Sequence, residues 1–136
     1  MESQVTKNTF HKSERLSDKT LINKLFTEGN RVITQFPFRV LWQPIKPTHE
    51  LYRAMVLFVV PKRTFKKSTQ RNRIKRQMRE LYRLNKNQTH QLLIEKEAAI
   101  VLSITYVEKK MTEYKPLSVA YQKLIKKIHT QIEQNL

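Results

Sequence analysis

Cysteine is absent from the 136-residue chain, while glycine occurs once, at Gly29, and aspartate once, at Asp18. The lack of cysteine excludes disulfide scaffolds, thiolate zinc sites and cysteine nucleophiles. A single glycine excludes the glycine-rich loops that let a backbone approach a nucleotide phosphate closely. The apolar run at residues 55–60 is far shorter than the ~20 residues of a membrane helix, and no charged-then-apolar leader opens the chain. We therefore expect a cytoplasmic protein.

Positive charge is what the chain has in excess. It contains 27 lysines and arginines against 11 acidic residues, which gives a net charge of +16. Hydrophobic residues make up 39% of the chain, enough to fold one domain and too many for a disordered basic tail. We expect a single domain over residues 10–134, preceded by a flexible arm at residues 1–9, that binds a polyanion.

The first thirty residues predict a polar arm followed by a short helix. Residues 1–15 lack an apolar period, so they indicate a mobile segment in which Phe10 is the candidate anchor. Ser17 or Asp18 can cap the helix, because a side-chain oxygen there accepts an orphan backbone N–H. Gly29 follows the apolar residues of that helix at the position where a left-handed C-cap is common.

Three later segments predict β-strands. Residues 51–60 are apolar on both faces, which is typical of a central strand, and residues 98–107 have the same two-sided character. In residues 31–42, Pro37 indicates either an edge strand or two short strands joined near it. If that segment is extended throughout, its apolar side chains share one face: Val32, Phe36, Phe38, Val40 and Trp42.

Two longer helices complete the predicted order of helix, strands, helix, strand, helix. One covers residues 70–85 or so, and residues 88–97 either extend it or form a separate turn. The last helix runs to residue 134, with Pro116 at its first helical position. Its apolar stripe consists of Leu117, Ala120, Tyr121, Leu124, Ile125, Ile128 and Ile132.

The positive charge is concentrated in residues 61–83, which hold ten basic residues and the acid Glu80, a net +9 of the total +16. At 100° per residue, an apolar stripe of Ile74, Met78 and Leu81 faces the core. The opposite side is an arc of Asn72, Lys75, Arg76, Arg79 and Arg83. Like charges at i,i+4 repel, and a polyanion would neutralise them. Arginine suits phosphate, and an asparagine amide can bind a base edge or a sugar hydroxyl.

Two plainer interpretations of this run stay open. The arc can be a solvated helix side on which Glu80 only orients Arg76 and Arg83, or the run can be a nuclear-localisation signal. Aromatic residues add a second open question, because Phe26 together with Phe36, Phe38 and Trp42 either lines a cleft for stacked bases or belongs to the core.

The acidic residues and histidines argue against catalysis by protein side chains. A nuclease needs clustered carboxylates for metal, or a histidine with a partner base. The ten glutamates are scattered, and the four histidines have neither HxH nor HExxH spacing. The sequence therefore predicts no catalytic side chain and leaves any metal position unknown.

The string RNRIKRQMRE at residues 71–80 resembles the signature helix of the protein subunit of bacterial ribonuclease P. Supporting elements occur in the same order: RL at 15–16, LF at 25–26 followed by Gly29, and VVPKR at 59–63. The resemblance spans roughly residues 10–130. It implies a single α+β domain of order αβββαβα, with a small mixed sheet and a left-handed βαβ crossover, similar to domain 2 of ribosomal protein S5.

The resemblance also implies a function. Members of this family bind the catalytic RNA of ribonuclease P and the single-stranded 5′ leader of precursor tRNA. They support Mg²⁺-dependent removal of the leader, with the metal held mainly by the RNA, and need no organic cofactor and no evident protein partner. A ribosomal or regulatory RNA-binding protein is the alternative, and a protein-only nuclease is a third hypothesis that the scattered carboxylates disfavour.

Site residues follow from the resemblance by position. The implied RNA-binding residues are Lys62, Arg63, Arg71, Asn72, Arg73, Lys75, Arg76 and Arg79. Arg83 is added to this set because it lies on the same basic arc of the helix. The implied leader cleft lies between the first helix and the sheet, with Ile22 and Phe26 on the helix and with Arg71 and Asn72 also facing the leader. Phe38 and Val40 are our own candidates for its sheet side. Ile22 stands where the family has an aromatic residue, so we expect apolar contact there in place of base stacking.

Overall fold

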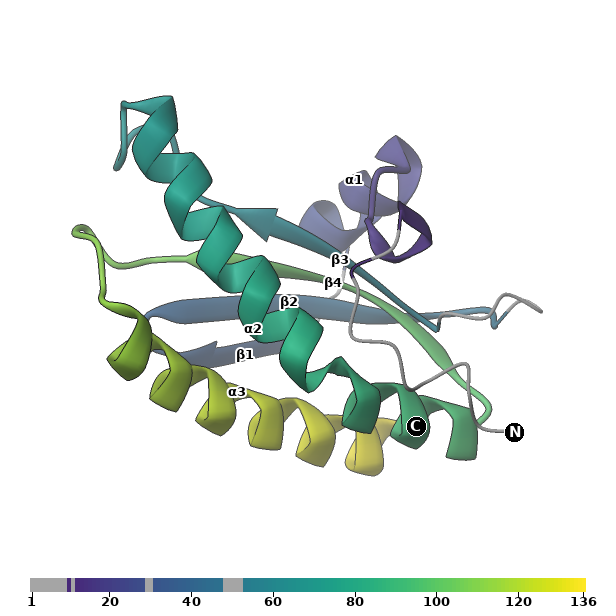
Figure 1. The fold of residues 1–136 in the computed structure, drawn as a ribbon. Coiled ribbons are helices and arrows are strands. Elements are labelled where there is room, and N and C mark those ends of the chain that lie inside the picture. Colours follow the sequence, from purple (N-terminus) through teal and green to yellow (C-terminus); the bar gives the residue numbers. More distant parts are fainter. Residues whose placement is uncertain (1–9, 11, 29–30, 48–52) are drawn as a thin grey trace.

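Three α-helices and four strands follow one another in the order predicted from the sequence (Figure 1). The computed structural model describes residues 10, 12–28, 31–47 and 53–136. The elements are a 3₁₀ helix η2 (Lys12–Glu14), α1 (Lys19–Thr27), β1 (Arg31–Gln35), β2 (Phe38–Ile45), β3 (Ala54–Val59), α2 (Ser68–Glu95), β4 (Ala99–Tyr106) and α3 (Tyr114–Asn135). Gly29 and the arm at residues 1–9 lie outside the described residues.

The four strands form one mixed sheet in the order β1-β2-β4-β3. β2 is antiparallel to both β1 and β4, whereas β3 is parallel to β4 and joined to it through α2. The expectation of a central strand at residues 51–60 is wrong, because β3 lies at the edge of this sheet. Its two apolar faces have another cause: α2 covers one of them, and the other is partly buried on the α1 side. The N-terminal segment that precedes α1 pairs along the free edge of β3, where Leu16 N donates to Val56 O at 3.0 Å.

Helices cover the two faces of the sheet unequally. α2 and α3 lie on one face and enclose the main core, whereas α1 lies on the other (Figure 1). The α1 side buries Leu16, Leu25 and Val101, and leaves further apolar residues, among them Leu41 and Leu57, half-buried. The apolar stripe predicted for the last helix is buried at every position.

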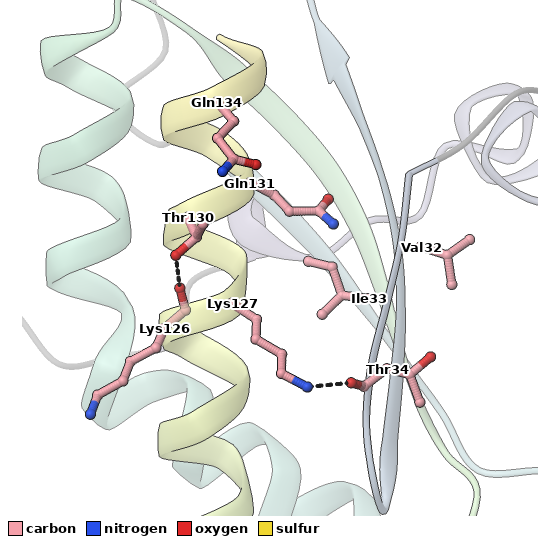
Figure 2. Close-up of a pocket in the computed structure, with 8 residues that line it drawn as sticks. All are labelled: Val32, Ile33, Thr34, Lys126, Lys127, Thr130, Gln131 and Gln134. Atoms are coloured by element: carbon pink, nitrogen blue, oxygen red, sulfur yellow. Dashed lines mark hydrogen bonds between the residues drawn. The ribbon is translucent and has the colours of Figure 1, made fainter.

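A hairpin replaces the single extended strand that residues 31–42 could have formed. β1 and β2 are joined at Phe36–Pro37, so the two-strand alternative is confirmed. Gln35 pairs with Phe38 across the turn. As a result, the odd-numbered residues of β1 and the even-numbered residues of β2 lie on the same face of the sheet. The single-face expectation is wrong for Val32 and Phe36, which are 47% and 59% exposed. Ile33 takes the inward place, pointing toward α3 while Val32 points away (Figure 2).

α2 is one continuous helix of 28 residues, so residues 88–95 extend it. The sequence gives no glycine signal for the end of this helix. The residue in the left-handed conformation after it is Glu97, with φ 53°. α3 begins two residues earlier than expected, which puts Pro116 third in the helix instead of first. Within the described residues no helix has both the length and the apolar character needed to cross a membrane.

The N-terminal segment is folded from Lys12 onward, so the expectation of a mobile arm to residue 15 is wrong. Glu14 is fully buried, and Lys86 of α2 donates to its two carboxylate oxygens at 2.9 and 2.7 Å. Phe10 is confirmed as an anchor, since its ring packs edge-on against Phe58 and Tyr82 at centroid distances of 5.8 and 5.7 Å.

Candidate nucleic-acid interface

α2 turns its charged side outward, as its periodicity predicts. Ile74, Met78 and Leu81 are buried beneath it. Asn72, Arg73 and Arg76 are exposed, and Lys75, Arg79 and Arg83 are partly exposed. We call these last six residues the basic face of α2.

The loop before α2 is fixed in place by its neighbours. Lys62 and Arg63 are exposed in a turn directly after β3, and Phe65 is buried against Tyr106. Arg71, which the sequence assigns to RNA, also has a structural role: its Nη1 donates to the carbonyls of Phe65 and Lys66 at 2.8 and 3.0 Å. The guanidinium thus holds the loop against the first turn of the helix.

Glu80 reduces the positive charge at the Arg83 end of the basic face. It pairs with Arg83, whose Nε donates to a Glu80 carboxylate oxygen at 3.2 Å, and this hydrogen bond lowers the pKa of Glu80. Glu80 therefore orients Arg83, one of the two arginines that it was expected to orient. Arg76 remains exposed, so the charge at the middle of the face is available to a partner.

Arg79 has a positively charged neighbour, Arg15, that the sequence did not predict. Partial burial lowers its pKa, and the guanidinium groups of Arg15 and Arg76 lower it further. Arg15 comes from the N-terminal segment, far from α2 in sequence. Sequence reasoning missed it as a site residue, although the RL pair at 15–16 is one of the elements that carry the family resemblance.

The α1 side of the sheet contains the residues expected to contact the leader. Asp18 caps α1, its carboxylate accepting from the backbone N–H groups of Thr20 and Leu21 at 2.9 and 3.2 Å. Phe26 projects from this helix and is 46% exposed, whereas Ile22 is half-buried against the sheet. An exposed phenyl ring on a capped helix is available for stacking.

Phe38 and Val40 correct the expected lining of that side. Both are 0% exposed and belong to the core beneath α3, where the Phe38 ring packs edge-on against Tyr121. Alternation along β2 instead places their neighbours Arg39 and Leu41 toward α1. The assignment of Phe38 and Val40 to the cleft is therefore wrong by one position in register. The binding roles of Ile22, Phe26, Arg71 and Asn72 stay predictions.

The described residues offer no donor set for a catalytic metal. Among them no three histidine, cysteine, aspartate or glutamate side chains gather closely enough to hold an ion. The site is therefore a charged and partly aromatic surface whose chemistry is suited to binding phosphate and bases.

The comparison with protein families decides the identity. The family model for ribonuclease P matches residues 10–129. The chain belongs to the ribonuclease P protein family. Two proteins of Porphyromonas gingivalis, each named ribonuclease P protein component, are 32% identical over 117 residues, which are 86% of this chain and 84% of theirs. One of the same name from Chlorobaculum tepidum is 35% identical over 89 residues, 64% of this chain and 57% of that protein.

The fold agrees with this membership. The ribonuclease P protein of Thermotoga maritima matches with a TM-score of 0.64 at 20% identity, over 84% of this chain and 96% of that chain. The expected α+β domain of order αβββαβα is thereby confirmed. Family membership gives the chain a role in ribonuclease P and in tRNA processing.

Proposed function

We propose that this chain is the protein subunit of a ribonuclease P holoenzyme. It binds the catalytic RNA through the basic face of α2 and the 5′ leader of precursor tRNA on the α1 side of the sheet. The observation that carries the proposal is the row of lysine, arginine and asparagine side chains held outward on α2 by a fully buried apolar stripe. Its supporting context is the family match over residues 10–129.

The chemistry of leader removal belongs to the RNA in this proposal. Mg²⁺ supplies charge neutralisation and activates the attacking water when it is bound, and it is held mainly by RNA phosphates. The protein contributes positive charge along α2 and an exposed aromatic ring on α1. Both groups position RNA, and the described residues contain no carboxylate cluster that would take over the metal.

One reconstitution tests the function. The protein is mixed with a bacterial ribonuclease P RNA at low Mg²⁺, and 5′ processing of a precursor tRNA is followed over time. We expect faster cleavage than with RNA alone, and the same mature 5′ end. No stimulation would contradict the role as a subunit and favour a ribosomal or regulatory RNA-binding protein. Cleavage by the protein without RNA would instead support a protein-only nuclease.

Phe26→Ala tests the contact with the leader. Base–aromatic stacking is worth about 1–3 kcal/mol per base, so the holoenzyme should bind precursor tRNA about 5- to 140-fold more weakly. Affinity for mature tRNA, which has no leader, should stay unchanged, and fluorescence anisotropy can measure both. Val119→Ala on α3, also an exposed apolar residue, is the matched control. Equal losses for the two tRNAs would show that Phe26 does not contact the leader.

A further inference from the structure

A hollow of about 420 Å³ lies between β1 and α3 (Figure 2). Its α3 wall carries Lys127, Thr130 and Gln131, and its β1 wall is the strand from Val32 to Thr34. The described residues around it include two lysines and no acid, and none of them belongs to α2. A hollow of this size is within the range of ligand sites, and its charge favours an acidic ligand.

Two polar side chains of α3 are held in position at this hollow. The Lys127 ammonium donates to the Thr34 carbonyl at 2.8 Å, which fixes a long side chain beside β1 (Figure 2). The side-chain oxygen of Gln131 accepts from the indole N–H of Trp42 at 2.8 Å. That bond sets the orientation of the carboxamide, so its NH₂ group is available to donate to a ligand. Both groups are donors, which suit carbonyl and carboxylate oxygens.

The backbone of β1 offers further hydrogen-bonding groups. β1 is the outermost strand on its side of the sheet, and within the described residues only β2 pairs with it. In an antiparallel pair, the backbone groups of successive residues point alternately toward the partner strand and away from it. The Thr34 carbonyl points away, since it meets Lys127, and the N–H and carbonyl of Val32 therefore point away as well. An added strand pairs with outward groups of this kind.

The lining distinguishes between occupants. No aromatic side chain is among the described residues around the hollow, so a nucleobase has no ring on which to stack. A second copy of this chain also carries a net charge of +16 and is repelled, and a lysine at a strand edge blocks pairing between edges. An acidic peptide meets neither obstacle, because its carboxylate binds the Lys127 ammonium and thereby frees the Thr34 carbonyl.

We propose that the free edge of β1 binds an acidic, extended peptide segment of a partner protein, which adds a strand to the four-stranded sheet. Val32 and Thr34 supply the main-chain hydrogen bonds, while Lys127 and Gln131 bind carboxylate and carbonyl oxygens. Lys127 also provides specificity, because it blocks the edge until a carboxylate displaces it. The proposal does not rest on a role in ribonuclease P, since the hollow contains none of the residues assigned to RNA or to the leader.

Titration of a short capped peptide of alternating valine and glutamate into the full chain tests the site. We expect the backbone amide signals of Val32 and Thr34 to shift together in NMR spectra and to become protected from hydrogen exchange. The matched control peptide has the same sequence with methylated backbone nitrogens, so it keeps the charge and loses the main-chain donors. Equal binding of the two peptides would overturn the added strand, and so would shifts confined to α2.

Val32→Pro tests the backbone of the edge. It removes the outward N–H, and an edge strand tolerates proline where the nitrogen does not bond to the neighbouring strand. Loss of this hydrogen bond should weaken binding of the acidic peptide about 10-fold. Val32→Thr is the control, because threonine keeps both the N–H and the branched side chain, and it should bind as the unaltered protein does. Unchanged binding by Val32→Pro would overturn the pairing with β1.

Lys127→Met tests the choice of an acidic partner. It should weaken binding of the valine–glutamate peptide about 10-fold, since a charge-assisted hydrogen bond is lost. A peptide with threonine in place of glutamate should instead bind more tightly than it does to the unaltered protein, because the block at the Thr34 carbonyl is gone. Lys115→Met, exposed on α3 outside the hollow, should change neither affinity. The same response to both peptides would overturn the role of Lys127.

A short single-stranded RNA is the alternative probe. If it shifts the Val32 and Thr34 amides more strongly than the acidic peptide does, the site binds nucleic acid and the peptide proposal fails. Failure of the proposed function is a separate result, because reconstitution with ribonuclease P RNA measures it without any peptide.

Discussion

Lys86→Met should lower the free energy of unfolding by about 3–5 kcal/mol, because it leaves the Glu14 carboxylate buried without the lysine's positive charge. The Glu14 and Lys86 side chains are 0% and 1% exposed, and the lysine donates to both carboxylate oxygens. Methionine is close to lysine in length, so the packing volume changes little. Urea unfolding followed by circular dichroism measures the loss as a lower midpoint at an unchanged slope.

Two further variants separate the buried charge from general effects. Glu14→Leu combined with Lys86→Met removes both charges and should restore most of the stability, since apolar residues often replace a buried ion pair at little cost. Lys96→Met breaks a more exposed pair, with Glu133 at 3.4 Å, and should cost less than about 1 kcal/mol. If Lys86→Met costs no more than Lys96→Met, the buried pair does not anchor the N-terminal segment.

This ion pair also explains what the sequence could not reveal about α2. Local periodicity marks Ile74, Met78 and Leu81 as its buried stripe, and the structure confirms them. Beyond Leu81 the inward positions include Lys86, Thr89 and His90, which are polar types that a pattern of apolar residues cannot recognise. Lys86 is buried because Glu14 meets it, and that partner is 72 positions away. The polar part of the buried side of α2 could therefore not be predicted locally, because it depends on a contact that only the folded chain makes.

For the strands too, the local sequence predicted where they break, but not how they pair with one another. Pro37 indicated a break that the structure confirms, but the register across the hairpin decided which residues face inward. Counting alternate residues through Pro37 placed Val32 on the core side, where Ile33 lies instead. Two-sided apolar character likewise predicted that β3 is covered, yet could not distinguish an edge strand beside the N-terminal segment from a central one.

The candidate site was predictable where its residues lie on one helix. The basic face of α2 follows from a period of 3.6 residues alone. The apolar pattern of α1 left open whether Phe26 lines a cleft or belongs to the core, and only the structure shows that it is exposed. Phe38 and Val40 required the face of β2 to be known. Arg15 required the N-terminal segment to pair with β3, which places it beside Arg79. The site is thus predictable within elements and not between them.

The basic face of α2 should carry most of the salt dependence of RNA binding. The triple variant Lys75→Gln, Arg76→Gln and Arg79→Gln removes three charges from it without touching the buried stripe. Each lost phosphate contact lowers the slope of log affinity against log salt by about 0.9, so the slope should fall by about 2.7 units. Between 50 and 200 mM salt, the unaltered protein should therefore lose about 40-fold more affinity for ribonuclease P RNA than the variant does.

A second triple variant on α3 is the matched control for net charge. Lys115, Lys123 and Lys126 are exposed, and changing all three to glutamine alters the total charge by the same amount. If RNA binding depends on a defined face of α2, the α3 variant keeps a slope close to that of the unaltered protein. Equal slopes for the two triple variants would mean that RNA senses the net charge of +16 as a whole and not the face on which α2 places it.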